Sequence, residues 1–289
     1  MDPAKLHLEL SLFAQRRLRP ALPDAPGSDD ARLRALEADF LEAERAAVAA
    51  DAAHAPDEPQ AFVEWFESLR QIGPGQGDPL FPWLAERATL SQMRWFLAQE
   101  VAGEAGFDDL VALTQVRMPV RAKLELARNY WDEMGRGREA GMHGPLLAHL
   151  AQAVDAEADL RTTVWESLAL ANLLVGLAFD RRYAYHSVGA LGVIELTAPG
   201  RVALVDRGLA RLGVPRVARR YFTLHATLDV QHSAAWNREV LAPLVSEVPR
   251  AARAIAEGAL MRLRAGARCF DRYRRELWRS EPAQPLEFR

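Results

Sequence analysis

Apolar residues recur every three or four positions along almost the whole chain, which is the spacing of one face of an α-helix. Ala, Leu, Arg and Glu dominate these stretches, and the long alternations of β-branched residues that indicate strands are absent. The pattern predicts helices over residues 4–18, 29–50, 60–70, 89–106, 119–131, 146–154, 161–179, 183–196, 201–212, 215–236 and 248–278. We therefore expect an all-α bundle.

Proline and glycine mark the breaks between these helices. The segment IGPGQGDP at 72–79 is the strongest loop signal, and it separates an N-terminal helical arm, residues 1–77, from a core at 78–280. Two or three helices make a thin core on their own, so we expect the arm to cover the core within a single domain. Pro199 and Gly200 predict a helix end, and the tail at 281–289 is predicted to be loose.

Composition narrows the class of protein. A net charge of −3, without a concentrated basic block, argues against nucleic-acid binding. Cys269 is the only cysteine, so an intrachain disulfide and a thiolate zinc cluster are excluded. The N-terminus lacks a basic start followed by an apolar run, and the longest apolar stretch, Leu168–Phe179, is too short to span a membrane. We therefore expect a cytoplasmic protein that does not bind membranes.

The stretch Tyr221–Trp236 carries the most specific chemistry. His225, Asp229 and His232 are spaced by four and three residues, which places them on one narrow, largely apolar face of a helix. Three buried ionisable groups are costly unless each is paired, hydrogen-bonded or bound to a metal. Nitrogen and oxygen ligands from one helix suit iron, manganese or zinc. The alternative is a pair of core histidines satisfied by Asp229.

Four more residues join this set. Glu100, Glu133 and Glu195 each lie on the apolar stripe of a separate predicted helix, and His143 lies in the glycine-rich segment 135–145. Each glutamate alone fits an ordinary salt bridge at a helix end. Together with the triple they give four carboxylates and three imidazoles, which suits two iron or manganese ions with a bridging carboxylate. The two Glu-x-x-His motifs of ferritin-like proteins are absent, so that class fits the ligand types but not their spacing.

The order of these residues resembles that of the heme-oxygenase-like diiron oxidases, also known as iron-containing redox enzymes. Two motifs carry the resemblance, DEMGRG…H at 132–143 and YFTLHATLDVQH at 221–232, with Glu195 thirty residues before His225. The resemblance covers roughly residues 78–245. Glu104 lies one helical turn after Glu100 and is an alternative to it.

The resemblance implies a heme-oxygenase-like helical bundle without heme, with two iron ions per chain and manganese as an alternative. It implies an O₂-dependent oxidoreductase that oxidises a small amino-acid-, amine- or fatty-acid-like substrate in a biosynthetic pathway. An external electron donor and a homodimer are compatible with it. The implied bridging carboxylate is Glu195, and the implied metal ligands are Glu100, Glu133, His143, Glu195, His225, Asp229 and His232.

Three other readings remain open from the sequence. One is a metal-independent enzyme of the same fold, similar to thiaminases or to enzymes of quinone-cofactor biosynthesis. The second is a non-catalytic helical protein in which these groups form a buried ionic network. The third is a heme oxygenase proper, which needs an axial histidine, and residues 78–90 contain none.

The four glycines of segment 135–145 suggest a physical consequence of metal binding. Each glycine inside a helix costs about 0.8–1 kcal/mol against alanine, so a helix through this segment is weak. We hypothesise that residues 133–145 become ordered only when Glu133 and His143 bind metal, and that the second iron is held weakly. Hydrogen exchange with and without iron tests this hypothesis.

Overall fold

The computed structural model describes residues 1–22, 30–104 and 106–279, so the tail at 281–289 lies outside the described residues. Over these ranges the chain is helical and forms no strand, which confirms the all-α prediction. The α-helices are α1 (Pro3–Leu18), α2 (Ala31–Ala46), α3 (Ala49–Ala52), α4 (Pro59–Ile72), α5 (Leu80–Glu86), α6 (Leu90–Gly103), α7 (Phe107–Thr114), α8 (Val120–Glu133), α9 (His143–Ala153), α10 (Trp165–Phe179), α11 (Ala184–Arg211), α12 (Arg220–Trp236), α13 (Ala242–Glu247) and α14 (Ala251–Arg279). Short 3₁₀ turns are η1 (Glu139–Gly141) and η2 (Arg181–Tyr183), and η3 (Asn237–Leu241) is a π-helical turn.

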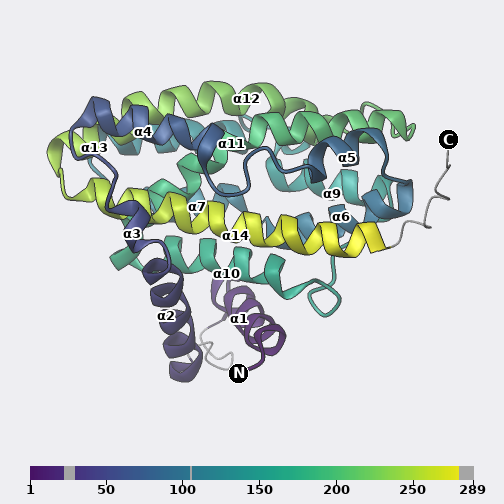
Figure 1. The fold of residues 1–289 in the computed structure, drawn as a ribbon, viewed down its shortest axis with the longest axis horizontal. Coiled ribbons are helices and arrows are strands. Elements are labelled where there is room, and N and C mark those ends of the chain that lie inside the picture. Colours follow the sequence, from purple (N-terminus) through teal and green to yellow (C-terminus); the bar gives the residue numbers. More distant parts are fainter. Residues whose placement is uncertain (23–29, 105, 280–289) are drawn as a thin grey trace, which may run out of the picture.

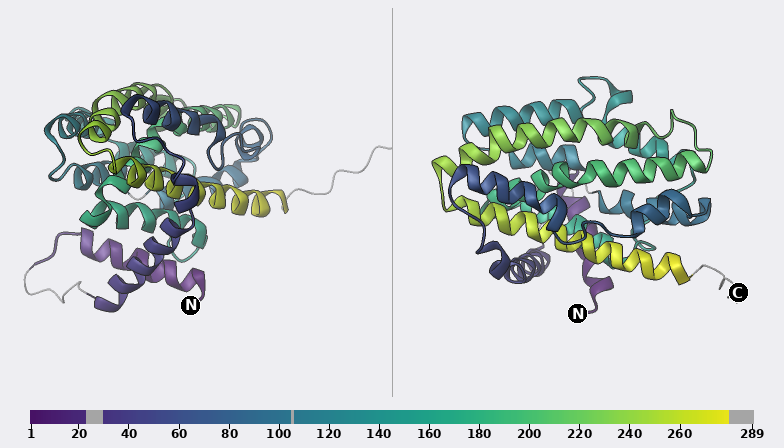
Figure 2. Two further views of the ribbon diagram at one scale, coloured as in Figure 1. Left: turned by 60° about the vertical axis from the view of Figure 1, so that its left-hand side comes forward. Right: turned by 45° about the horizontal axis from the view of Figure 1, so that its top comes forward.

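Helix α11 lies at the centre of the bundle and packs against α5, α12 and α14 (Figures 1 and 2). Two glycines allow this close packing. A Cβ atom on Gly189 would lie 1.9 Å from the backbone oxygen of Ile255 in α14, and one on Gly192 would lie 2.5 Å from the indole nitrogen of Trp236 in α12. Small residues within one turn of α11 therefore allow both α14 and α12 to approach it closely.

The predicted helix end at Pro199 and Gly200 is wrong, because α11 continues through both residues to Arg211. A proline in a helix interior costs about 3 kcal/mol or more. Leu196 before it and Val205 after it are both buried in the hydrophobic core, and this packing outweighs the local cost. The unbroken helix is long and apolar enough to cross a membrane by length and composition, but 56% of its most apolar stretch is buried inside the bundle. It therefore has the burial of a core helix.

The N-terminal segment packs directly onto this bundle. Helices α1 and α2 contact α10, α2 and α3 contact α14, and α4 contacts α11 and α13. Figure 1 shows α1 and α2 beneath α10. Buried Phe13, Phe40 and Phe62 belong to the same hydrophobic cluster as Leu191 of α11. One continuous core therefore includes residues of the arm.

Helix α6 begins as the sequence predicts. Thr89 and Gln92 form a capping box, in which the Thr89 hydroxyl accepts a hydrogen bond from the Gln92 amide and the Gln92 side chain accepts one from the Thr89 amide. The helix ends at Gly103, so Glu100 lies in its last turn and Glu104 is its C-cap residue. This difference of one turn places the two glutamates in different surroundings.

Candidate metal centre

Six of the seven ligand candidates converge from four helices. Glu133 is the last residue of α8, His143 is the first residue of α9, Glu195 lies in α11, and α12 carries the other three. The side chains of all six are buried, with 2 to 6% of each residue exposed: Glu133, His143, Glu195, His225, Asp229 and His232. The bundle therefore holds three carboxylates and three imidazoles in its interior.

A tight loop between α8 and α9 brings Glu133 and His143 together. An isolated antiparallel bridge joins Met134 and Met142, and the glycines at 135 and 137 have φ angles of 61° and 79°. A Cβ atom on Gly135 would lie 2.4 Å from the Arg138 oxygen, so glycine is required there. The glycine-rich segment is thus a closed turn that presents its two flanking side chains on one side.

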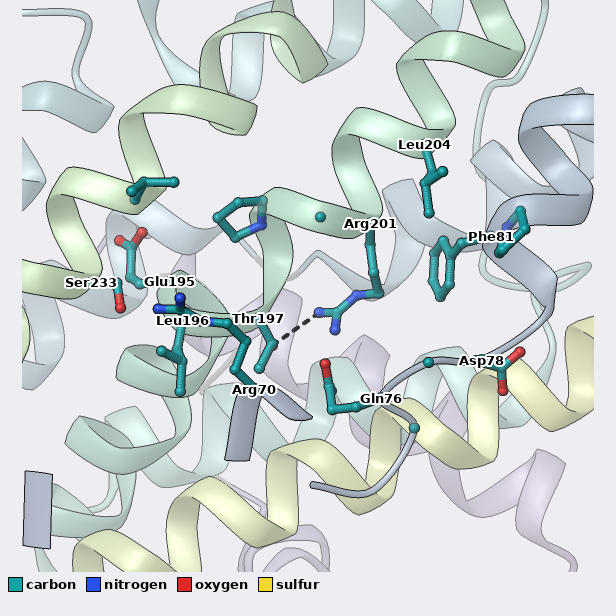
Figure 3. Close-up of a pocket in the computed structure, with 16 residues that line it drawn as sticks. Arg70, Gln76, Asp78, Phe81, Glu195, Leu196, Thr197, Arg201, Leu204 and Ser233 are labelled. Carbon is teal, nitrogen blue, oxygen red and sulfur yellow. Dashed lines mark hydrogen bonds between the residues drawn. The ribbon is translucent and has the colours of Figure 1, made fainter. Parts of the chain in front are cut away.

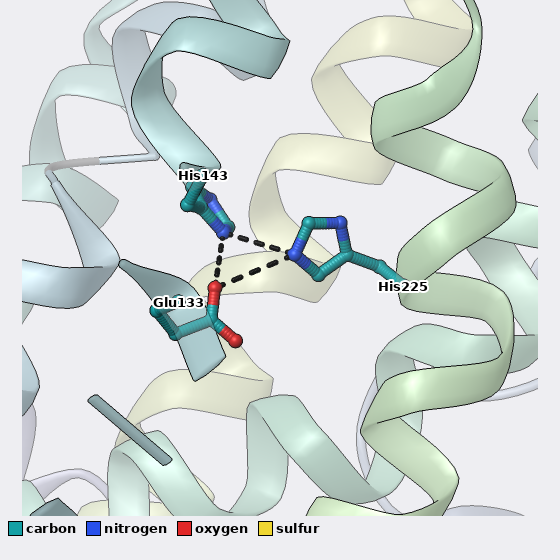
Figure 4. Close-up of side chains that lie close together, drawn as sticks. All are labelled: Glu133, His143 and His225. Atoms are coloured by element: carbon teal, nitrogen blue, oxygen red, sulfur yellow. Dashed lines mark hydrogen bonds and ion pairs between the residues drawn. The ribbon is translucent and has the colours of Figure 1, made fainter. Parts of the chain in front are cut away.

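The first group of ligand atoms consists of Glu133, His143 and His225 (Figure 4). Glu133 Oε2 lies 2.8 Å from His143 Nδ1 and 3.4 Å from His225 Nε2, and the two ring nitrogens are 3.1 Å apart. Atoms that bind one ion at about 2.1 Å, with angles near a right angle or a tetrahedral angle, lie roughly 3.0–3.4 Å from one another. The spacing of these three atoms therefore fits a metal ion.

The second group consists of Glu133, Glu195 and His232. His232 Nδ1 lies 3.6 Å from Glu133 Oε1 and 3.4 Å from Glu195 Oε1. Asn129 donates a hydrogen bond of 2.5 Å to Glu195 Oε1 and so holds that carboxylate in place. Glu133 directs one oxygen toward each group, which places it between them. The resemblance had implied this position for Glu195.

The outer nitrogen of each imidazole contacts a protein acceptor. His225 Nδ1 lies 2.7 Å from the Tyr221 carbonyl oxygen, His232 Nε2 lies 3.2 Å from Asp132 Oδ2, and His143 Nε2 lies 2.9 Å from Glu104 Oε1. An N–H on each outer nitrogen satisfies these acceptors and leaves the inner nitrogen with a free lone pair. Metal-binding histidines show the same arrangement, because the outer partner fixes the tautomer and the ring orientation.

The pKa values reflect a shortage of positive charge around the carboxylates. Burial raises the pKa of Glu133, but hydrogen bonds and charges from His143 and His225 outweigh it and bring the pKa well below its usual range. Burial lowers the pKa of His143, yet the Glu104 and Glu133 carboxylates raise it well above its usual value. Without a metal ion, protons on the imidazoles therefore balance the carboxylates.

His232 and Asp229 show the same shortage on the second side. Burial lowers the pKa of His232, but the carboxylates of Glu195 and its neighbours raise it to about 9. Burial, followed by the charges of Glu195 and Glu133, raises the pKa of Asp229 to about 9. The Oδ1 atom of Asp229 is buried without a hydrogen-bond partner among the described residues. A cation at this position would satisfy both groups.

The structure separates Glu100 from Glu104. Glu104 contacts His143 Nε2, and its carboxylate also accepts hydrogen bonds from the backbone amides of Gly106 and Phe107. Glu100 lies in neither group of ligand atoms. Its surroundings are Arg201, Arg262 and the hydroxyl of Tyr273. Glu104, which was the alternative to Glu100 in the sequence analysis, therefore lies beside the candidate centre. It contacts the side of His143 that faces away from Glu133.

One residue of the candidate centre was not identified in the sequence analysis. Asp132 contacts the outer nitrogen of His232 and is held by an ion pair of 2.6 Å with Arg136. The only sequence signal was its position beside Glu133, because the apolar pattern does not mark it. Asn129, which lies one helical turn before Glu133, donates to Glu195.

Two hollows reach the centre from different sides. An outer cleft of about 440 Å³ extends to Glu195, and Figure 3 shows Arg201 on its wall with a hydrogen bond to Thr197. An inner cavity of about 140 Å³ extends to Glu104, His143 and Tyr221. Most of the other residues that line the inner cavity are apolar. Both sides of the candidate centre are therefore accessible to small molecules.

Comparisons with known proteins agree with this geometry. Residues 94–267, well over half of the chain, match the family described as iron-containing redox enzyme. Two crystal structures of a CADD-like protein of unknown function from Nostoc punctiforme PCC 73102 have a similar fold, each with a TM-score of 0.56. One is 17% identical and aligns over 76% of this chain and 96% of its own, and the other is 16% identical over 83% and 98%. No curated protein matches the sequence.

Proposed function

Because this chain belongs to the family of iron-containing redox enzymes, we propose that it is a non-heme diiron enzyme that uses O₂ to oxidise a small organic molecule. The observation that carries the proposal is the orientation of three imidazoles. Each has its outer nitrogen against a protein acceptor and its inner nitrogen beside a buried carboxylate. When a metal ion displaces the protons from the inner nitrogens, each lone pair faces a position beside these carboxylates, which is the arrangement that metal ligands require.

The proposed ligands divide between two ions. His143 and His225 hold the first, Glu195, Asp229 and His232 hold the second, and Glu133 bridges the two because each of its oxygens faces one group. Nitrogen and carboxylate ligands in this mixture suit iron, and manganese also fits them. Glu104 is assigned as the partner that orients His143, in place of Glu100 as a ligand.

The bound iron pair would supply the electrons and the open positions for O₂ chemistry. The chain itself holds the ligands rigid, excludes bulk water by burial, and positions the substrate. Tyr221 contributes to this, since its hydroxyl lies 3.2 Å from His143 Nε2 and its side chain lines the inner cavity. An external electron donor supplies the electrons that the substrate does not.

Two rival functions predict different behaviour. A metal-independent enzyme of the same fold would leave the six buried residues without a role, although five of them form two groups of possible ligand atoms. A non-catalytic ionic network would lose stability when its histidines are removed and would retain no iron. Metal content after purification separates both rivals from the proposal.

The test is the reaction of iron-loaded protein with O₂. Metal-free protein is loaded with Fe(II) under argon and mixed with O₂ while absorbance and O₂ uptake are followed. We expect a transient visible absorbance and O₂ uptake in the wild-type protein. Both should be absent from His225→Ala, which keeps the other ligands. Equal O₂ uptake by both proteins would contradict the proposal.

A further inference from the structure

A second charged cluster, whose residues are partly buried, lies on the wall of the inner cavity. It consists of Glu100 in α6, Arg201 in α11 and Arg262 in α14. All three side chains line the cavity, whose remaining wall is formed mainly by Leu, Val, Ile and Phe. Two positive charges and one negative charge therefore face a largely apolar space.

The two arginines lack the acceptors that buried guanidinium groups require. Within the described residues, Arg262 makes no hydrogen bond and no ion pair within 4 Å, and its Nε atom is buried without a partner. Arg201 donates only to the Thr197 hydroxyl, at 3.2 Å, and lies near the rings of Phe81 and Phe270. A guanidinium carries five N–H donors. Most of those on these two side chains are therefore available to a ligand.

The pKa values of the two arginines also indicate that their positive charges lack negative partners. Burial, followed by the positive charge of Arg262, lowers the pKa of Arg201 to about 9. Burial also lowers the pKa of Arg262. The charge of Glu100 acts on both arginines, but its carboxylate forms no ion pair within 4 Å with either of them among the described residues. Two positive charges therefore share one negative charge beside the cavity.

We propose that Arg201 and Arg262 form the binding site for the carboxylate of the substrate, which is a small acid with an apolar chain. Arginine binds carboxylates through paired N–H donors. The apolar wall then holds the carbon chain of the acid, and the cavity extends to Glu104, Tyr221 and the outer side of His143. This assignment rests on the proposed function, because it uses the metal centre as the place of reaction.

The dimensions limit the substrate to a short molecule. Glu100, beside the arginines, and Glu104, beside the metal centre, are one helical turn apart, about 6 Å along α6. The inner cavity has a volume of about 140 Å³, which is small for a ligand site. A short acid fits these limits better than a long-chain fatty acid.

The experiment measures acid binding without turnover. Sodium hexanoate is titrated into the full-length protein as purified, by calorimetry, with hexanamide and hexylamine as uncharged and cationic analogues. We expect hexanoate to bind and the two analogues not to bind. Arg262→Gln and Arg201→Gln should weaken hexanoate binding by about ten- to a hundredfold, since hydrogen bonds to charged groups contribute this much.

Matched controls separate the arginines from other causes. Arg264→Gln removes an exposed arginine from the same helix and should leave hexanoate binding unchanged. If Arg262→Gln fails to fold, Arg262→Lys keeps the charge without the planar donors and should bind hexanoate with intermediate affinity. Equal binding of hexanoate and hexanamide, or equal binding by wild type and both glutamine variants, overturns the assignment.

Two further arms distinguish the carboxylate site from the metal centre and from an amino-acid site. Repeating the titration after chelation should leave hexanoate binding in place. Binding that is lost on chelation and unaffected by Arg262→Gln assigns the acid to the metal instead and overturns the proposal.

Norleucine is also titrated. Tighter binding of norleucine than of hexanoate supports the carboxylate site and identifies the substrate as an α-amino acid whose ammonium group pairs with Glu100. Acid binding by a protein that binds no iron would refute the diiron function alone.

Discussion

Two clusters of ionisable side chains, one buried and one partly buried, adjoin the same inner cavity, and they lack opposite partners. At the candidate metal centre, acceptor atoms of His143, His225 and Glu133 lie within 3.4 Å of one another, so a proton or a metal ion must lie between them. At the other cluster, Arg201 and Arg262 present N–H donors without enough acceptors. Buried charges are costly unless they are paired. A surplus of acceptors therefore indicates a cation, and a surplus of donors indicates an anion.

The largest effect should come from Glu133, which belongs to both groups of ligand atoms. Replacing it in Glu133→Ala removes a ligand from both ions. We expect iron affinity to fall by more than about a hundredfold at both sites, because loss of a partner of a ligand alone costs ten- to a hundredfold. Iron content after dialysis measures this. Glu139→Gln, at an exposed position of the neighbouring loop, is the control and should retain full iron.

The residues that contact the outer nitrogens of His143 and His232 should each affect the affinity of one ion. Glu104→Ala removes the partner of His143 and should weaken the first ion by about ten- to a hundredfold. Asp132→Ala removes the partner of His232 and should weaken the second ion by a similar factor. Chelator competition resolves the two affinities. If each variant weakens both ions equally, the division of ligands is incorrect.

Metal affinity should rise with pH. The pKa values of His232 and Asp229 are both about 9 in the metal-free protein, so both groups hold a proton at pH 7. Metal binding must displace these protons, and each one displaced gives about a tenfold gain in affinity per pH unit below that pKa. Fe(II) binding measured anaerobically from pH 6 to 8 tests this. An affinity that is independent of pH would mean that neither group loses a proton.

At the carboxylate site formed by Arg201 and Arg262, a substitution should raise the stability of the protein while it weakens ligand binding. Arg262→Met replaces a partly buried guanidinium, whose Nε atom has no partner among the described residues, by an apolar side chain of similar length. Replacing poorly paired charges by apolar side chains is often neutral or stabilising. We expect a gain of about 1 kcal/mol, or roughly 2–4 °C in Tm for a domain of this size, together with loss of hexanoate binding. Thermal unfolding of the ligand-free protein measures the gain. A large loss of stability would show that Arg262 has a structural partner.

The smallest effect concerns the loop at 134–142. Its backbone is held by the bridge between Met134 and Met142 and by turns at its glycines. Iron bound to Glu133 and His143 would join the side chains at its two ends, so metal binding should slow hydrogen exchange of the loop amides. Exchange rates that stay the same with and without iron would refute the coupling between metal and loop.

The sequence predicted well where chemistry follows local periodicity. His225, Asp229 and His232 share one face of α12, and the apolar residues around them indicated burial. Glu133 and His143 are joined by a turn, where no helical period applies, so their proximity depended on a family resemblance. The identity of the family and the all-α fold are both confirmed.

Tertiary packing decided the features that the sequence could not. Glu100 and Glu104 lie one turn apart on α6, and the turn into α7 fixes Glu104 beside His143. Packing along α11 carried that helix through Pro199. Arg201 and Arg262 line one cavity because α11 and α14 pack side by side, so no local pattern could pair them.

The most direct test of the central claim is anaerobic titration of the metal-free protein with Fe(II), with the bound iron counted by Mössbauer spectroscopy. We predict two equivalents of iron per chain in the wild-type protein, with signals that show the ions are close enough to interact, and neither equivalent in Glu133→Ala. A wild-type protein that binds no iron, or binds a single ion as tightly as Glu133→Ala does, would contradict a diiron centre bridged by Glu133.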